Sequence, residues 1–336
     1  MTVTAMTHDA TSSRTATGLL LALASATTFG MSGVLARGLI DTGWSAGAAV
    51  TVRIVIAATV LVVPGVLALR GRWHLVRDNA GLITVYGVTA VAGAQLCYFY
   101  AVTYMQVSVA LLLEYTAPVA VVLWLWLRHG HRPSGLTILG AAIAAGGLVL
   151  VLDVVSGAEL SAVGVLWALG AMVGAATYFV ISADESNGLP GISLAAGGLL
   201  VAGAVLLGAG ALGLLPLRAS TAPAVYDGHS VPWWLPVLAL GLVAAAFAYV
   251  TGIEAGRRLG SRLASFVALG EVLAAVIFAW LLLGELPRTI QLAGGLLVLA
   301  GVVVVKLGES RAPLVAAPLP EPEPQPEPEV SERPAA

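Results

Sequence analysis

The main pattern in the sequence is a series of apolar stretches separated by short polar joints. An α-helix needs about 20 mostly apolar residues to cross the hydrocarbon core of a bilayer. The stretches of this length cover residues 17–40, 45–69, 80–101, 107–127, 134–152, 161–181, 192–216, 232–255, 263–283 and 289–306. The pattern predicts an all-α integral membrane protein with about ten transmembrane helices.

Polar segments lie at both ends of this apolar series. Residues 1–16 form a polar N-terminal tail, and the apolar run after them is a full span without a small-residue cleavage site. We therefore expect a retained first helix rather than a removed signal peptide. Residues 309–336 are rich in Pro and Glu, with the two alternating over residues 320–329. We expect this tail to be disordered, because it has too few apolar side chains to form a core.

The basic residues fall mainly on one side of the predicted topology. If the N-terminus is cytoplasmic, the inner side holds Arg14, Arg70, Arg72, Arg77, Arg128, Arg132, Arg257, Arg258, Arg262, Lys306, Arg311 and Arg333. The outer side then holds only Arg37, Arg218 and Arg288. Because basic loops stay inside, both termini are expected in the cytoplasm, at the inner (plasma) membrane of a bacterium. The joint at residues 183–191 is an exception, since it should face inward but has no basic residue.

The composition limits the partners and the chemistry. Only 10% of the residues are charged, against about 25% in a typical soluble domain, and the net charge of −2 leaves no basic surface for a nucleic acid. The single cysteine, Cys97, cannot form an internal disulfide and is expected to be a packing residue. The five histidines lie in tails, joints or helix ends, so we expect no metal site and no cofactor.

Part of the sequence is repeated. A shift of 154 residues lays residues 107–151 on residues 261–305 without a gap. The matching pairs include Ala120 with Ala274, Trp126 with Trp280, Gly130 with Gly284, Pro133 with Pro287, Gly140 with Gly294 and Gly147 with Gly301. Chance similarity between two Ala/Gly-rich segments is the alternative. A duplication whose copies are separated by five spans would be inverted in the membrane, which is the architecture of many secondary transporters.

The same segments resemble the EamA-type exporters of the drug/metabolite transporter superfamily. The most specific stretches are LGEVLAAVIFAWLLLGELP at residues 269–287 and QLAGGLLVLAG at residues 291–301; Phe29–Gly30 and Arg53 also match the family. The resemblance implies two five-helix repeats, which we place at residues 17–152 and 161–306. The sequence EYTAP, from Glu114 to Pro118, is similar to the branch that exports threonine and homoserine.

Two positions depart from the family pattern. His131 stands at a turn where family members often have Glu, although Glu285 is present in the second copy. Val272 stands where a Pro commonly follows the glutamate that corresponds to Glu271, so a proline-dependent kink in the ninth helix is in doubt.

Arg53, Glu114 and Glu271 lie well inside predicted spans. A charge at the bilayer centre costs about 2.5–3.5 kcal/mol, so these side chains should face the bundle interior or a wet cavity. Glu114 could take up a proton or bind a substrate amino group, with Arg53 holding its charge or position. A permanent Arg53–Glu114 pair that only fixes helix register is an equal alternative. Glu271 is either a protonatable gate or a residue bonded to neighbouring polar groups.

Aromatic and hydroxyl residues at mid-span are further candidates for a binding site, through ring faces and hydroxyl groups. They are Phe29, Ser32, Tyr98, Tyr115, Trp167, Tyr178 and Tyr249. The resemblance implies a pathway lined by the first, third, fourth, sixth, eighth and ninth helices, but ordinary packing would also explain such residues. Pro118 removes a backbone donor to the carbonyl of Glu114, so it is a candidate hinge.

The buried charges and the repeat favour a proton-coupled secondary transporter, and the resemblance implies that it exports amino acids or related small molecules. A multidrug exporter of cationic amphiphiles within the same superfamily is the first alternative, and a channel or non-transporting membrane scaffold is the second. No P-loop is present, which argues against an ATP-driven pump, and the sequence gives no sign of an enzyme. The oligomeric state stays open.

Overall fold

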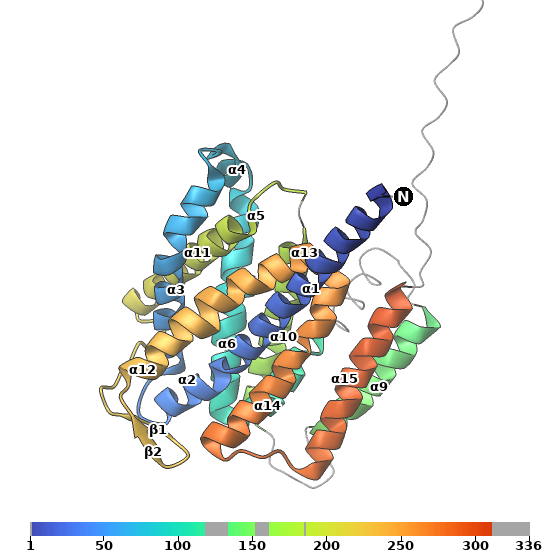
Figure 1. Cartoon of the computed structure of the whole chain (residues 1–336). Helices are drawn as coiled ribbons and strands as arrows, with labels where there is room; N and C mark the ends of the chain where they lie inside the picture. The colour runs from blue at the N-terminus through green and yellow to red at the C-terminus, as the bar shows by residue number, and fades with distance from the viewer. Residues whose placement is uncertain (1, 118–133, 152–160, 185, 311–336) are drawn as a thin grey trace, which may run out of the picture.

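The fold is a bundle of apolar helices with one small β-hairpin at one end (Figure 1). The computed structural model describes residues 2–117, 134–151, 161–184 and 186–310. Six helices in this part are long and apolar enough to cross a membrane: Ala16–Ile40, Ala46–Leu69, Ala80–Tyr104, Ala162–Ser182, Gly191–Ala211 and Trp234–Leu259. Shorter apolar helices cover Gly135–Leu150, Gly270–Leu283 and Thr289–Val305. The predicted span at residues 107–127 is described only as far as residue 117, so the predicted total of ten helices is not established.

The helices follow one another through short connections. The first half contains α1 (Thr2–Gly30), α2 (Ser32–Ile40), α3 (Ala46–Leu69), α4 (His74–Asp78), α5 (Ala80–Val85), the π-helix η1 (Tyr86–Gly93), α6 (Ala94–Tyr104), α7 (Val107–Glu114) and α9 (Gly135–Val151). The second half contains α10 (Ala162–Ala183), α11 (Gly191–Ala211), β1 (Ala224–Tyr226), β2 (His229–Val231), α12 (Trp234–Leu238), the π-helix η3 (Ala239–Phe247), α13 (Ala248–Ala268), α14 (Gly270–Leu283) and α15 (Thr289–Ser310).

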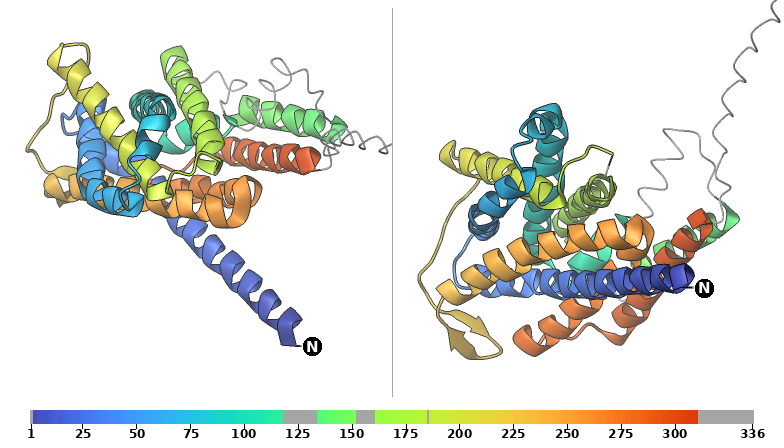
Figure 2. Two further views of the ribbon diagram at one scale, coloured as in Figure 1. Left: turned by 90° about the horizontal axis from the view of Figure 1, so that it is seen from above. Right: turned by 45° about the horizontal axis from the view of Figure 1, so that its top comes forward.

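Helices of the first half pack mainly on helices of the second half. The pairs are α1 with α13, α3 with α11, α6 with α10, α7 with α14 and α9 with α15. Figure 2 shows α1 and α13 side by side. Small residues allow the close contacts: a Cβ atom built on Gly174 of α10 would lie 2.4 Å from the Cβ of Ala94 in α6. Van der Waals packing of this kind is the main source of helix association in lipid.

The α9–α15 pair is reciprocal. A Cβ on Gly140 would lie 2.7 Å from the carbonyl oxygen of Gly301, and a Cβ on Gly147 would lie 2.7 Å from that of Gly294. The two helices therefore run antiparallel. The repeat aligns Gly140 with Gly294 and Gly147 with Gly301, so each glycine touches the counterpart of the other. A self-complementary contact of this type is what a two-fold axis between related units produces.

Irregular backbone also recurs at the repeat distance. The shift of 154 residues places η1 on residues 240–247, which lie inside η3. The helical run that starts with α7 is interrupted by a turn at Tyr115, and a turn at Leu269 separates α13 from α14 at the equivalent position. π-Helical segments and interrupted spans occur frequently at functional sites of membrane proteins. These four segments are therefore candidates for a functional site.

Three features differ from the sequence-based expectation. Helix α1 begins at Thr2, ahead of the apolar run at residue 17, and the first span has a turn at Met31. Helix α13 continues to Ala268, although a joint was expected near residues 256–262, because that segment is polar but contains no proline to end a helix. Glu271 consequently lies in the first turn of α14 rather than deep within a helix that starts at residue 263. The interruption before α14 is present even though Val272 replaces proline.

The β-hairpin was not predicted from the sequence. Its turn contains Asp227 and Gly228 with φ values of 46° and 77°, the left-handed backbone that Asp-Gly turns of hairpins adopt. The Tyr226 hydroxyl donates to the carbonyl oxygen of Leu35 at 2.9 Å, which fixes the hairpin against α2. We call this end of the bundle the hairpin end. The opposite end, which contains α4 and the start of α1, is the N-terminal end (Figure 1).

Candidate functional site

A cavity of about 110 Å³ lies inside the bundle between the two halves. Its lining comes from α1, η1, α6, α7, α10, α13 and α14. These elements belong to the first, third, fourth, sixth, eighth and ninth predicted spans. The volume exceeds the roughly 10–15 Å³ that a single water needs, so the cavity has room for a small polar molecule or several waters.

Aromatic rings form one wall of the cavity. Phe29 of α1 meets Tyr249 of α13 edge to face at 5.1 Å between ring centroids, and Tyr178 of α10 lies 6.0 Å from Tyr249. Phe179, which also lines the cavity, contacts Tyr178 at 5.4 Å. Such a wall presents ring faces and hydroxyl groups together, which suits a ligand with an apolar part and a cationic group.

Two carboxylates, Glu114 and Glu271, line the same cavity. The Tyr115 hydroxyl donates to Oε2 of Glu271 at 2.7 Å, which joins the interruption after α7 to the first turn of α14. A carboxylate is favoured in the first turn of a helix by the exposed backbone N–H groups there. Glu114 is the last residue of α7, and within the described part of the chain its carboxylate accepts no hydrogen bond. It is therefore available to a proton or a ligand.

The glycine of the aromatic-Gly pair at the end of α1, Gly30, is needed for a close contact with α14. A Cβ at this position would lie 2.9 Å from the carbonyl oxygen of Glu271 and 3.0 Å from the backbone nitrogen of Ala275. Only glycine lets α14 come this close. The close approach holds Phe29 and Glu271 at the same cavity.

Arg53 lies behind the cavity rather than in its lining. Ser45 caps α3 by accepting a hydrogen bond from the backbone N–H of Ala48. Arg53 lies at the start of the third turn of this helix and is 0% exposed. Its guanidinium donates to the side chain of Gln95 and to the carbonyl oxygen of Ala244 in η3, and it lies 5.6 Å from the ring centroid of Phe99.

The direct Arg53–Glu114 ion pair considered from the sequence is absent. Among the described residues Arg37 pairs with Asp41 and Arg258 pairs with Glu254, and neither Arg53 nor Glu114 takes part in an ion pair. Both charges lie on the predicted spans, but Gln95 of α6 takes the position beside the Arg53 guanidinium. Arg53 still attracts Glu114 and Glu271 electrostatically from a longer distance.

The remaining sequence-predicted residues lie elsewhere. Ser32 and Tyr98 are buried outside the cavity lining, and Trp167 stacks on Tyr100 with 4.8 Å between ring centroids. Pro118 falls outside the described residues. The structure thus brings together Phe29, Glu114, Tyr115, Tyr178, Tyr249 and Glu271, with Arg53 behind them.

Gln95 is a lining residue that the sequence reasoning missed. It lies in the middle of an apolar span, but it is neither charged nor aromatic, and the candidates were selected mainly by those two properties. Its signal becomes clear from the repeat, because the shift of 154 residues pairs Gln95 with Tyr249.

Comparisons with known proteins agree with this arrangement. The EamA-like transporter family matches the chain twice, at residues 16–153 and 162–307. The chain belongs to this family. No curated protein matches the sequence significantly. A solved structure described as "Crystal structure of protein" resembles 89% of this chain and 99% of its own, with a TM-score of 0.59 and 19% sequence identity. At this identity the likeness concerns the fold alone.

Membership of the EamA-like family gives the general role of the protein. Members are membrane transporters of the drug/metabolite transporter superfamily. The apolar helices described above accordingly belong to a multi-pass membrane protein, whose partners are the lipid bilayer and a small-molecule substrate. The cavity lies between the two segments that match the family.

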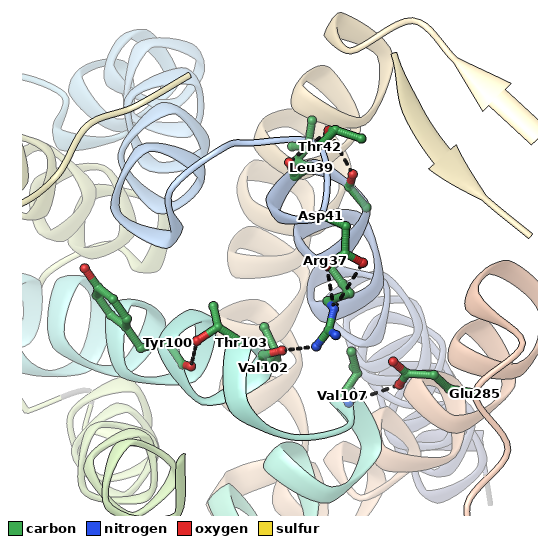
Figure 3. A network of polar contacts seen from close by, with 10 residues as sticks. Arg37, Leu39, Asp41, Thr42, Tyr100, Val102, Thr103, Val107 and Glu285 are labelled. Atoms are coloured by element: carbon green, nitrogen blue, oxygen red, sulfur yellow. Dashed lines mark hydrogen bonds and ion pairs between the residues drawn. The ribbon is translucent and has the colours of Figure 1, made fainter. Parts of the chain in front are cut away.

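A network of polar contacts joins helices at the hairpin end of the bundle (Figure 3). Arg37 donates from Nε to Asp41 at 3.0 Å and from Nη1 to the carbonyl oxygen of Val102. The backbone N–H of Val107 donates to Oε2 of Glu285 at 3.4 Å. These contacts tie α2 to the end of α6, and α7 to the joint between α14 and α15. Burial raises the pKa of the Glu285 carboxyl above its usual range, while the Val107 N–H and the Arg37 charge act in the opposite direction.

Proposed function

We propose that this EamA-like protein is a secondary active transporter that exports amino acids or related small molecules, with protons as the coupling ion. One observation carries the proposal: a cavity between the two halves holds two carboxylates and several aromatic rings within an apolar bundle. Ionisable groups inside a membrane protein are costly, so their presence favours a transport role. The part of the chain that the structure describes shows no cluster of metal-binding side chains, and no enzymatic role is proposed.

The proposed mechanism is alternating access by two inverted five-helix repeats at residues 17–152 and 161–306. The antiparallel, reciprocal contact of Gly140 with Gly301 and of Gly147 with Gly294 supports an inverted relationship. Related halves of this type can exchange two shapes around one central site. In the present shape a polar network joins helices at the hairpin end. The cavity-lining residues of α1 come before the turn at Met31, so they lie between this network and the N-terminal end.

We assign the N-terminal end, residues 1–16 and residues 309–336 to the cytoplasm of a bacterial cell.

The carboxylates provide the coupling chemistry in this proposal. Glu114 has no hydrogen bond within the described chain, so it can exchange a proton for the ammonium group of a substrate. Glu271 is held by Tyr115 and adds a second negative charge. The rings of Phe29, Tyr178 and Tyr249 would contact the rest of the substrate. The same rings and carboxylates also support the alternative, export of cationic amphiphiles.

Counterflow in proteoliposomes tests the proposal. The purified protein would be given a panel of amino acids, sugars and organic cations, with and without a pH gradient. A carrier saturates and responds to the gradient, a channel does neither, and a scaffold moves no solute. Preference for amino acids supports the main proposal, and preference for organic cations supports the alternative.

Two glutamine variants test the carboxylates. Glu114→Gln and Glu271→Gln are expected to lose the acceleration of transport by a pH gradient. Glu254→Gln is the matched control, because Glu254 lies on α13 and is paired with Arg258 outside the cavity lining. Full proton-driven transport in both cavity variants, at matched expression, would remove these carboxylates from the mechanism.

A further inference from the structure

The orientation of the Gln95 amide is determined by Arg53. Gln95 lines the cavity, and the buried guanidinium of Arg53 contacts its side chain. A guanidinium has five N–H donors and no acceptor, so the atom that faces it must be the amide oxygen. The amide nitrogen, Nε2, is therefore turned away from Arg53. It has two N–H donors, and the Tyr249 hydroxyl beside it can occupy one of them.

Gln95 and Tyr249 mark the centre of the molecule. They are equivalent in the repeat and line the same cavity, where the Gln95 amide and the Tyr249 hydroxyl lie close enough to influence each other. A residue can touch its own counterpart only when both lie next to the axis that relates the two halves. The remaining N–H of Gln95 therefore belongs to a side chain that lines the cavity next to the axis between the two halves, where a substrate would be enclosed in alternating access.

The charges around the cavity are separated. The carboxylates of Glu114 and Glu271 are on its wall, while the positive charge of Arg53 is fully buried behind Gln95. Within the described residues, no carboxylate lies within ion-pair distance of Arg53, and its Nε has no hydrogen-bond partner. A hydrogen bond from Arg53 polarises the Gln95 amide and strengthens its remaining N–H as a donor. The cavity wall thus combines two carboxylates with an amide donor, on Gln95, that the buried Arg53 strengthens.

We propose that Gln95 is the specificity-determining residue that binds the carboxylate of a zwitterionic amino acid, through the Nε2–H that Arg53 orients. Arg53 is a positioning residue, which acts through Gln95 without touching the substrate. The ammonium group of the same substrate faces Glu114 and Glu271. This inference rests on the proposed function, and it names the substrate class as α-amino acids with a free carboxylate rather than amines in general.

The test compares threonine with two analogues that lack its carboxylate, threonine amide and 1-amino-2-propanol. Counterflow of each compound is measured in proteoliposomes with the wild-type protein, Gln95→Glu, and the control Gln291→Glu at the start of α15. Gln95→Glu has the same size and keeps an acceptor for Arg53, but it removes the N–H donors and adds a negative charge. Gln95→Met, which removes both polar atoms at similar length, is the second variant.

The expected result is a change in substrate preference rather than a general loss of transport. The wild-type protein and the control should move threonine at least about tenfold faster than threonine amide, because a site built to hydrogen-bond a group rejects analogues without it. Both Gln95 variants should reduce this ratio to about one or below. A wild-type protein that moves threonine amide as fast as threonine, or variants that keep the wild-type ratio, would overturn the inference and leave the proposed function intact. A wild-type protein that moves none of the three compounds, nor any other amino acid, would contradict the proposed function itself.

Discussion

The hydroxyl of Tyr115 and the carboxylate of Glu271 are joined by a 2.7 Å hydrogen bond across the interface of the two halves. Tyr115 lies at the turn that follows α7, and Glu271 lies in the first turn of α14. The bond therefore connects two backbone interruptions at nearly equivalent positions of the repeat. Because the two residues are on different halves, a movement that separates the halves at this point would break the bond.

Tyr115→Phe is expected to weaken both the fold and transport. The substitution removes the hydroxyl donor and leaves the Glu271 carboxylate without its partner, a loss of about 1.5–3 kcal/mol for a hydrogen bond to a charged group. We expect a reduction of about tenfold in kcat/KM for counterflow, together with a lower thermal midpoint in detergent. Tyr104→Phe is the control, because Tyr104 is 50% exposed and lies outside the cavity lining. Equal effects of the two substitutions would show that the Tyr115 hydrogen bond has no special role.

Neighbouring glycines of α9 give a second prediction. A Cβ on Gly147 would meet the backbone nitrogen of Val298 at 2.6 Å, whereas a Cβ on Gly146 would meet no atom within 4 Å. Gly147→Ala should therefore force α9 and α15 apart and destabilise the protein by about 1–3 kcal/mol. Gly146→Ala should be neutral or stabilising by up to about 1 kcal/mol, because alanine favours helix. Thermal unfolding in detergent measures both variants, and equal melting temperatures would contradict the close α9–α15 contact.

The sequence predicted most of the helices because every span must be apolar and long enough to cross the lipid. In the part of the chain that the structure describes, apolar length alone located nine apolar helices to within a few residues at most ends. The repeat was visible because Gly140, Gly147, Gly294 and Gly301 are needed for close packing and keep their spacing. The π-helices η1 and η3 and the hairpin were not predicted, since they depend on tertiary contacts or on a short turn rather than on apolar length.

The site was predicted less completely than the fold. Buried charge is costly in lipid, so Glu114 and Glu271 could be identified from residue type and position. The hydrogen-bond partner of Arg53 could not be identified in this way. The depths of Arg53 and Glu114 in their spans do not determine which third helix lies between the two. Gln95 of α6 occupies that place. Trp167 shows the opposite error, since an aromatic residue at mid-span can simply stack on another ring, here that of Tyr100.

Topology is tested by labelling single cysteines in a Cys97→Ala background. If the two halves are inverted and both termini are cytoplasmic, Ala5→Cys and Ala335→Cys should react with a membrane-impermeant maleimide only after the cells are permeabilised. Ser230→Cys, in the exposed strand β2, should react in intact cells, because the hairpin lies at the opposite end of the bundle. Labelling of the two termini from opposite sides would contradict an even number of spans and the inverted arrangement.

The contact between Glu285 and α7 predicts a specific pH dependence of stability. Burial raises the pKa of the Glu285 carboxyl above its value in the unfolded chain, about 4.3, with Asp41 acting in the same direction and Arg37 in the opposite one. A group with a raised folded-state pKa contributes stability at low pH, and this contribution is lost as the pH rises through that pKa. Glu285→Gln has no proton to lose, and its amide oxygen can still accept the Val107 N–H. The melting temperature of the variant should therefore be close to that of the wild type near pH 4 and increasingly higher than it towards pH 8.

Melting curves of both proteins in the same detergent at each pH measure this difference. The titration of all other groups affects both proteins equally, so it cancels in the difference. A difference that shrinks as the pH rises would mean that the ionised Glu285 stabilises the hairpin end, through Arg37 and Val107, by more than its burial costs.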